Sequence, residues 1–219
     1  MTPNANQSTR ILFIGNSYTS RHQLPRLIAD LAAAVDPAMV IEPVAIVAGG
    51  ASLRRHWNAG AAQKALAASQ WDFVVLQEQS TLPVKNPQRY HENVRLFAAE
   101  VAKCGAALAL YLTWSRQGTA AQPQITRAVE EIAAEVRARV VPVGPAWQRA
   151  LRERPDVPLY LDDGSHPTAA GAYLAACVFV AALFGLRPSG STVPDRLGID
   201  RDTATVFQTI AHETSVATA

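Results

Sequence analysis

Short apolar runs alternate with helix-forming stretches along most of the chain. The runs are rich in β-forming residues and predict five strands, over residues 10–15, 39–47, 71–76, 106–113 and 140–143. Amphipathic or alanine-rich stretches predict the main helices, over residues 21–35, 51–69, 88–103, 123–139 and 202–214. Strands that alternate with helices are typical of a parallel sheet covered on both faces. The pattern therefore predicts an α/β protein with a three-layer α/β/α architecture.

Two further helices complete the predicted order. A brief helix follows Pro145, and an apolar one opens at His166-Pro167. The second contains the segment 169–186, which has no charged residue and is almost long enough to span a membrane. Alanine dominates this segment, however, and contributes little to membrane insertion. We therefore expect a central helix packed on the sheet and no membrane association.

Length and composition limit the possible classes of protein. The chain has 219 residues, of which 49% are hydrophobic and 17% charged, with a net charge of +2. This is enough for one domain with a proper core, so we expect a single domain over residues 1–219. Within it, residues 1–9 are expected to be flexible and residues 187–219 to form a C-terminal connector and helix. The basic residues are scattered, which argues against a nucleic-acid surface.

Cysteine usage and the N-terminal residues favour a cytoplasmic location. The two cysteines, Cys104 and Cys177, are too few for a disulfide framework. Cys177 falls in the alanine-rich helix, where an inert core thiol is expected. The first ten residues lack the apolar run of a signal peptide. We therefore expect the protein in the cytoplasm.

Candidate chemistry follows the strands. The segments concerned are Gly15-Asn16-Ser17, Gly49-Gly50, Gln77-Glu78-Gln79 and Thr113-Trp114, after the first to the fourth strand. In a parallel sheet these ends lie at one edge, where ligand sites gather. Asp163 and His166, just before the apolar helix, can reach the same edge. A serine, a histidine and an acid are the set that acyl transfer requires, although Ser17 alone is equally typical of a helix cap.

Two of these segments resemble known sequence blocks. Gly15-Asn16-Ser17-Tyr18-Thr19 resembles the first block of the SGNH (GDSL-type) hydrolases, with Asn in place of the usual Asp. Asp163-Gly164-Ser165-His166-Pro167 resembles their last block, and Gly50 falls where the second-block glycine is expected. The resemblance covers roughly residues 10–185. It implies a flavodoxin-like order of the five parallel strands and a serine esterase without a cofactor.

The resemblance also implies roles for individual residues. Ser17 would be the nucleophile and His166 the base, and Asp163, rather than its neighbour Asp162, would orient the base. The oxyanion hole would comprise the backbone N–H groups of Ser17 and Gly50, with Gly49 as the alternative to Gly50, and a third-block side chain.

The third block departs from the family pattern. It usually reads Gly-x-Asn-Asp, whereas this chain has Gln77-Glu78-Gln79-Ser80. A glutamine amide can donate the same N–H as asparagine. We align Gln79 with the family asparagine and keep Gln77 as its rival. Glu78 is rejected, because an ionised carboxylate cannot donate.

Several other residues are candidates for contacts with a substrate. Asn16 precedes the predicted nucleophile and Gln77 begins the third block. Trp57 and Trp114 could line the site or pack in the core. Arg54 and Arg55 follow the Gly50 turn and could hold an anionic group, although a solvated helix face is the simpler interpretation. The remaining histidines lack the mutual spacing of a metal site and are expected on solvated helix faces: His22, His56, His91 and His212.

The sequence therefore predicts a serine esterase that hydrolyses short acyl esters, such as O-acetyl groups on carbohydrates. No metal or other cofactor is expected, and the partner is a small-molecule ester. An acyltransferase with the same triad, or a non-catalytic carbohydrate- or ester-binding domain of the same fold, are the alternatives. The sequence leaves the oligomeric state open.

Overall fold

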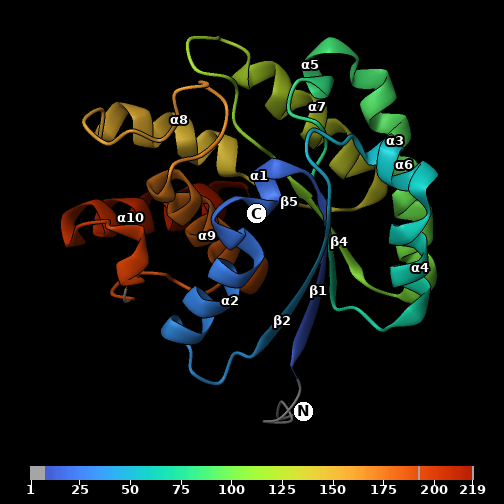
Figure 1. Cartoon of the computed structure of the whole chain (residues 1–219), viewed down its shortest axis with the longest axis horizontal. Coiled ribbons are helices and arrows are strands. Elements are labelled where there is room, and N and C mark those ends of the chain that lie inside the picture. The colour runs from blue at the N-terminus through green and yellow to red at the C-terminus, as the bar shows by residue number, and fades with distance from the viewer. Residues whose placement is uncertain (1–7, 192, 219) are drawn as a thin grey trace.

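Five parallel strands form the central sheet, in the order β2-β1-β3-β4-β5 (Figure 1). The strands are β1 (Thr9–Gly15), β2 (Ile41–Val47), β3 (Phe73–Leu76), β4 (Ala107–Tyr111) and β5 (Arg139–Val141). This is the predicted flavodoxin-like order, and all five strands lie where the apolar runs place them. The computed structural model describes residues 8–191 and 193–218. Residues 1–7 of the segment expected to be flexible lie outside this description, whereas Thr9 already pairs with Ile41 in the sheet.

The alternation of side chains along β1 divides the interior into two cores. Ile11 and Phe13 point into one core, and Leu12 and Ile14 into the other. The first core is covered by four helices: α2 (Leu24–Val35), α8 (Val143–Glu153), α9 (Ala169–Phe184) and α10 (Arg201–Thr218). The second is covered by four more: α3 (Leu53–Ala59), α4 (Ala61–Ala68), α6 (Pro87–Cys104) and α7 (Gln122–Val136). The predicted three-layer α/β/α architecture is confirmed.

The apolar helix α9 is the centre of the first core. Most of its residues are buried against the sheet and against α2, α8 and α10, as the alanine-rich sequence predicts. Its 16 residues correspond to a length of about 24 Å. Among the described helices, none combines the length and the apolar character that crossing a membrane requires.

Two predicted helices are divided in the structure. The stretch 21–35 begins with a 3₁₀ turn, η1 (Arg21–Gln23), before α2, and a separate short helix, α1 (Ser17–Ser20), precedes it. His22 and Gln23 separate the segments because both have positive φ angles, 52° and 54°. The stretch 51–69 divides at Gly60, whose φ of 74° ends α3 and begins α4.

Three connections also differ from expectation. The loop after β3 contains the short helix α5 (Leu82–Lys85), and η2 (Asp195–Leu197) lies in the connector 187–198. Helix α8 begins at Val143, before Pro145, because proline is tolerated in a first helical turn. These differences add two short helices and move the start of α8, and they leave the sheet unchanged.

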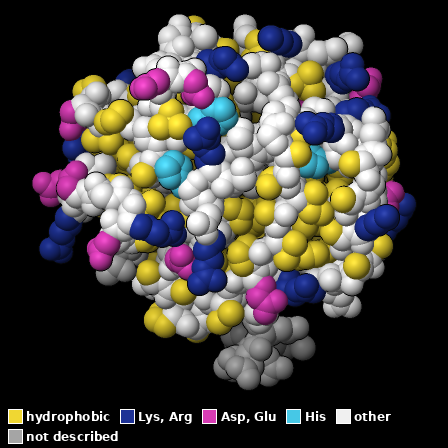
Figure 2. Space-filling view, viewed as in Figure 1, with side chains coloured by type: hydrophobic (Ala, Val, Ile, Leu, Met, Phe, Trp, Pro, Cys, Tyr) yellow, Lys and Arg dark blue, Asp and Glu magenta, His cyan; other side chains and the backbone are white. Residues whose placement is uncertain are grey.

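The outer edge strand of the sheet exposes apolar side chains. Val44 and Val47 of β2, and Val40 just before it, are exposed. Hydrophobic side chains gather over that part of the face in Figure 2.

Candidate active site

Ser17 is held at the carboxyl end of β1 by a tight turn into α1. Asn16 is the N-cap of this helix, and its Oδ1 accepts a hydrogen bond from the Tyr18 N–H at 3.1 Å. The Asn16 amide also donates to the Ala51 carbonyl at 3.0 Å, which ties the turn to the segment after β2. A Cβ at Gly15 would lie 2.5 Å from Thr19 Oγ1, so only glycine fits before the turn. Asn16 is therefore buried in the turn and acts on its geometry.

The segment that carries His166 folds back on itself between α8 and α9. Tyr160 and Pro167 form an antiparallel bridge, and the Leu161 N–H donates to the His166 carbonyl at 2.8 Å. At its tip, Gly164 has a φ of 61°, a conformation that favours glycine. This bridge directs the loop toward α1.

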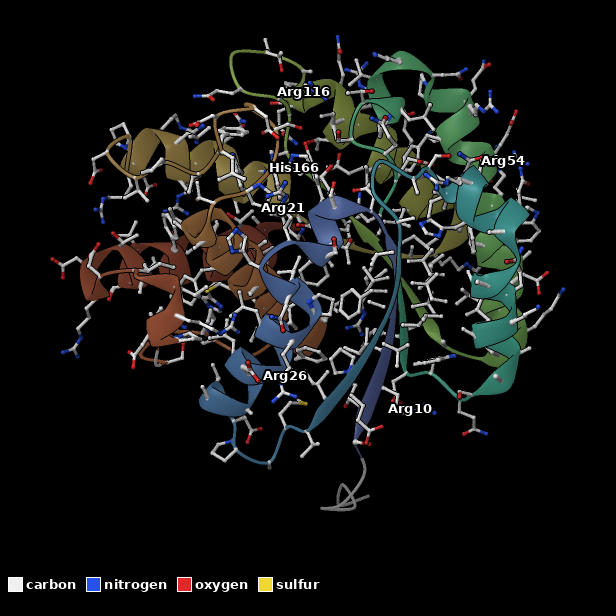
Figure 3. The ribbon with its side chains drawn as sticks, viewed as in Figure 1. Arg10, Arg21, Arg26, Arg54, Arg116 and His166 are labelled. Atoms are coloured by element: carbon white, nitrogen blue, oxygen red, sulfur yellow. The ribbon has the colours of Figure 1, made fainter. Side chains whose placement is uncertain are left out.

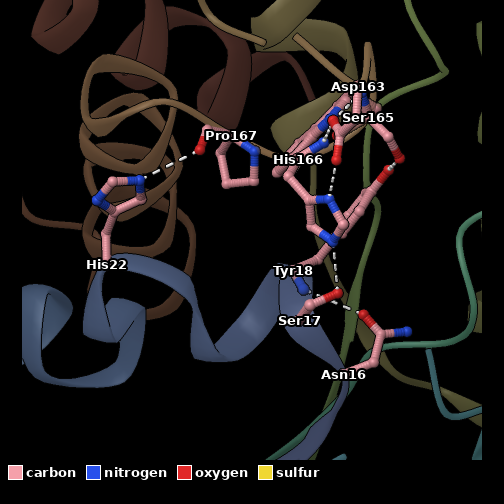
Figure 4. Close-up of polar contacts among 9 residues, drawn as sticks. Asn16, Ser17, Tyr18, His22, Asp163, Ser165, His166 and Pro167 are labelled. Carbon is pink, nitrogen blue, oxygen red and sulfur yellow. Dashed lines mark hydrogen bonds and ion pairs between the residues drawn. The ribbon is translucent and has the colours of Figure 1, made fainter. Parts of the chain in front are cut away.

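Ser17, His166 and Asp163 lie in one hydrogen-bonded row (Figure 4). Ser17 Oγ is 2.8 Å from His166 Nε2, and His166 Nδ1 bonds to Asp163 Oδ2. The other oxygen of Asp163 accepts the backbone N–H groups of Ser165 and His166, each at 2.9 Å. The His166 side chain, followed by these two backbone N–H groups, holds the pKa of the Asp163 carboxyl well below its usual range. Of the two adjacent acids, Asp163 is therefore the one that contacts His166.

A series of aromatic rings packs against the His166 side of this hydrogen-bonded row. The Tyr18 ring meets His166 edge-on at 5.7 Å and stacks on Trp114 at 4.8 Å. Trp114 stacks in turn on Trp147 at 3.8 Å, and its indole N–H donates to the Ser165 carbonyl at 3.0 Å. Trp114 is only 1% exposed. Of the two interpretations that the sequence left open for Trp114, the structure shows packing in the core, where the ring stacks on Tyr18 and Trp147.

Trp57 also packs away from the row. Its ring is half-buried and meets Phe97 of α6 edge-on at 5.3 Å. Of the two interpretations that the sequence left open for Trp57, the structure shows packing against the second core.

The two glutamines after β3 differ in the hydrogen bonds that their side-chain amides form within the protein. Gln77 is buried, and its Oε1 accepts from the Asn16 N–H at 2.8 Å and from Thr19 Oγ1 at 3.0 Å. Its amide nitrogen donates to the Glu78 carbonyl. Both ends of the Gln77 amide are thus occupied within the protein. Gln77 is therefore unsuited to the role in substrate binding or in the oxyanion hole that the sequence left open for it.

Gln79 is oriented differently. Its Oε1 accepts from both the backbone N–H and the hydroxyl of Thr81, each at 3.0 Å. Within residues 8–191 and 193–218, no group accepts a hydrogen bond from its amide nitrogen. The half-buried Gln79 therefore keeps an N–H donor available for a ligand.

Glu78 has a structural role that was not predicted from the sequence. Its Oε1 accepts the backbone N–H groups of Leu53, at 3.0 Å, and Gln79, at 2.7 Å, and its Oε2 accepts from Asn93 Nδ2 at 2.9 Å. Burial raises the pKa of the Glu78 carboxyl, although these hydrogen bonds act in the opposite direction. Glu78 therefore joins the segments after β2 and β3 to α6. An acid directly after a buried strand was the signal available in the sequence.

The segment after β2 brings Gly50 toward the same turn. Gly50 has a φ of 63° and is exposed, and it precedes Ala51, whose carbonyl holds the Asn16 amide. Gly49 is also exposed, and its carbonyl accepts a hydrogen bond from Arg55 at 3.4 Å.

Three of the other histidines form hydrogen bonds to backbone carbonyls, and the expected place on a solvated helix face is wrong for His56. His56 is 6% exposed and donates to the Gly15 carbonyl at 2.7 Å, and burial lowers its pKa. His91 donates to the Ala128 carbonyl at 2.8 Å, and His22 to the Pro167 carbonyl at 3.2 Å (Figure 4). Among the described residues, no group of three histidine, cysteine or acidic side chains could hold a metal ion.

Cys177 lies fully buried in α9. Burial raises the pKa of its thiol to about 12, which keeps it protonated at neutral pH. The expectation of an inert core thiol is confirmed by this environment.

No protein-family profile and no curated protein sequence matches this chain. Several solved structures, however, are similar to this chain. The chain is 29% identical to a candidate SGNH hydrolase from Slackia heliotrinireducens, with a TM-score of 0.69, covering 81% of this chain and 100% of that one. The chain has the SGNH hydrolase fold.

Two further structures share this SGNH fold over nearly their full length. A DUF4886 family protein from Bacteroides uniformis is 22% identical, with a TM-score of 0.80, and covers 96% of this chain and 95% of its own. The acetylxylan esterase Axe2 from Geobacillus stearothermophilus is 20% identical, with a TM-score of 0.62, and covers 90% of this chain and 97% of its own. The structural neighbours therefore include a candidate SGNH hydrolase and an acetylxylan esterase.

Proposed function

We propose that this protein is a serine esterase that hydrolyses short acyl esters, acetyl esters above all, through Ser17, His166 and Asp163. The single observation that carries the proposal is the row in which Ser17 Oγ lies 2.8 Å from His166 Nε2 while His166 Nδ1 contacts Asp163. A helix-capping serine would not need a histidine at hydrogen-bond distance from its hydroxyl.

The geometry supports a two-step acyl transfer. With its Nδ1 proton held by Asp163, neutral His166 presents Nε2 as the acceptor for the Ser17 hydroxyl proton. Ser17 Oγ then attacks the ester carbonyl carbon, and His166 returns the proton to the leaving alcohol oxygen. In the second step His166 takes a proton from water, whose oxygen attacks the carbonyl carbon of the acyl-enzyme. His166 then returns this proton to Ser17 Oγ as the bond between that oxygen and the acyl carbon breaks, which releases the carboxylic acid.

Three donors are proposed for the oxyanion. The Ser17 N–H belongs to the first turn of α1, where no intrahelical acceptor exists. The Gly50 N–H comes from the turn that Asn16 holds through Ala51. The third donor is the Gln79 amide, because its oxygen is bound by Thr81 and its nitrogen is available. Each such donor contributes about 3–4 kcal/mol to lowering the barrier.

Hydrolysis is favoured over acyl transfer to an alcohol by the exposure of the row. The side chains of His166 and Asp163 are 25% and 46% exposed. An acyltransferase with the same residues would have to keep water away from the acyl-enzyme. Here water has direct access to the base that activates it.

A carbohydrate acetyl ester is the proposed substrate class. The support for it is the fold shared with an acetylxylan esterase, a likeness that covers 90% of this chain and 97% of that one. A cytoplasmic location remains part of the proposal.

The experiment compares hydrolysis of p-nitrophenyl esters of increasing acyl length by wild type and Ser17→Ala. Wild type is expected to prefer acetate and to be labelled covalently by a fluorophosphonate. Ser17→Ala should lose the label and about 10⁴–10⁶-fold in kcat. Ser20→Ala, an exposed serine of the same short helix, is the matched control and should retain both. Absence of turnover and of labelling in wild type would refute the proposal, and a preference for alcohol acceptors over water would indicate a transferase.

A further inference from the structure

A pocket of about 440 Å³ lies between α3, α5 and α6, next to the Gly50 turn. Its volume is within the range of about 300–1,000 Å³ that is usual for small-molecule sites. Three arginines line it, Arg54 and Arg55 from α3 and Arg89 from α6. Among the described residues that line it, none carries a carboxylate.

The positive charge of this pocket is only partly compensated. Arg54 donates to Asn93 Oδ1 at 2.9 Å and lies 3.7 Å from Glu92. Arg55 and Arg89 are exposed, and neither forms an ion pair with any residue of the described ranges. Figure 2 shows Lys and Arg side chains gathered over this end of the molecule, with few acidic ones between them. Arg55 donates one hydrogen bond, to the Gly49 carbonyl at 3.4 Å. The pocket therefore offers two guanidinium groups, those of Arg55 and Arg89, that have no carboxylate partner within the described residues.

Hydrogen bonds connect the pocket wall to the proposed oxyanion donor Gln79. The buried Asn93 donates to Glu78, and Glu78 accepts the Gln79 backbone N–H at 2.7 Å. Leu82, which also lines the pocket, donates its N–H to the Gln79 carbonyl at 2.9 Å. In Figure 3, Arg54 lies toward the same edge of the sheet as His166, and Arg10 toward the opposite end. The pocket wall is therefore connected to the segment that carries Gln79.

We propose that the pocket formed by Arg54, Arg55 and Arg89 binds an oxyanionic group, a carboxylate or a phosphate, on the alcohol part of the ester substrate. This inference rests on the proposed function and adds a charge requirement to it. The planar guanidinium group matches the paired oxygens of both anions and binds them through charge-assisted hydrogen bonds. The substrate is thus an acidic acyl ester.

Binding can be measured without catalysis. Calorimetric titrations of Ser17→Ala would use trigalacturonate for the carboxylate, glucose 6-phosphate for the phosphate, and xylotriose as the neutral reference. At least one anionic probe is expected to bind about tenfold more tightly than xylotriose, and this preference should weaken at high salt, because ions screen exposed charges. The tighter anionic probe identifies which oxyanion the pocket takes.

Charge-removing variants assign this preference to the pocket. Arg55→Gln combined with Arg89→Gln should remove the preference of Ser17→Ala for the anionic probe. Arg152→Gln is the matched control, because Arg152 is an exposed arginine of α8 in the other helix layer. The proposal is overturned if neither anion is preferred over xylotriose, or if the double variant keeps the preference.

Kinetics separate this inference from the proposed function. In the otherwise wild-type enzyme, the double variant should raise KM about tenfold more for O-acetylated trigalacturonate than for O-acetylated xylotriose. If the enzyme hydrolyses both esters and the double variant changes KM equally for the two, the anion-binding pocket is overturned while the proposed esterase function is retained. Arginine-dependent binding of trigalacturonate by a protein that hydrolyses no ester would refute the esterase and support the anion site.

Discussion

The Gln77 side-chain oxygen accepts the backbone N–H of Asn16 at 2.8 Å, although 61 positions separate the two residues in the chain. The same oxygen accepts the Thr19 hydroxyl at 3.0 Å, so one amide holds both ends of the turn that carries Ser17. The position of the proposed nucleophile therefore depends on the residue that directly follows β3. This relationship explains why a glutamine that donates nothing to a ligand still belongs to the site.

Gln77→Leu is expected to damage stability and activity together. It would leave the buried Asn16 N–H and the Thr19 hydroxyl without their acceptor, which costs about 1–3 kcal/mol for a buried donor. Urea unfolding should show this loss, and kcat for p-nitrophenyl acetate should fall because Ser17 is no longer held in place. Gln88→Leu, an exposed glutamine of α6, is the control and should change neither quantity. An unchanged urea-unfolding midpoint in Gln77→Leu would contradict the role of Gln77 in holding the turn that carries Ser17.

Asp163→Asn is expected to preserve the fold and to lower kcat by about 10⁴-fold. The asparagine can no longer favour the His166 tautomer that accepts the Ser17 proton. Asp162→Asn, at the adjacent exposed acid, should retain most of the activity. The two variants are compared by steady-state kinetics after circular dichroism has verified their folding. Equal losses in both would show that neither acid is specific to His166.

Gln79→Ala is expected to lower kcat by about 10²–10³-fold with little change in KM or in the unfolding midpoint, because it removes a donor that acts mainly in the transition state. Thr81→Val should have a smaller effect in the same direction, since it removes only one of the two hydrogen bonds that orient the amide. If Gln79→Ala retained full kcat, the third oxyanion donor would have to be sought elsewhere.

Glu78 should make stability depend on pH in the direction opposite to most acids. Burial raises its pKa in the folded state, so the folded protein binds a proton more readily than the unfolded chain does. Stability from this group therefore rises as pH falls from the folded-state pKa toward the ordinary value of about 4.3. The free energy of unfolding is measured against pH for wild type and Glu78→Gln. The difference between the two curves should change with pH in this range, and parallel curves would contradict the raised pKa.

The parallel sheet could be predicted from local patterns, whereas its strand order was predicted from the resemblance to the SGNH hydrolases. Runs such as Ile11–Ile14 are apolar on both faces because helices cover both, and this produces the continuous β-rich pattern that the sequence shows. Helix boundaries were less predictable. The positive φ angles of His22 and Gln23 occur in residues that carry no turn signal, so nothing in the local sequence indicated that the helix would divide there.

By itself, the sequence determined the α/β architecture and the approach of Ser17, Asp163 and His166 to one edge of the sheet, because parallel strands place all their carboxyl ends together. Only the tertiary structure decided between neighbours of equal chemistry. Gln77 and Gln79 have the same side chain. The Gln77 oxygen already accepts hydrogen bonds from Asn16 and Thr19, whereas Thr81 binds only the Gln79 oxygen and leaves its amide nitrogen available. Likewise, Trp114 is enclosed by Tyr18 and Trp147. Such choices depend on contacts between residues far apart in the chain, which no local pattern records.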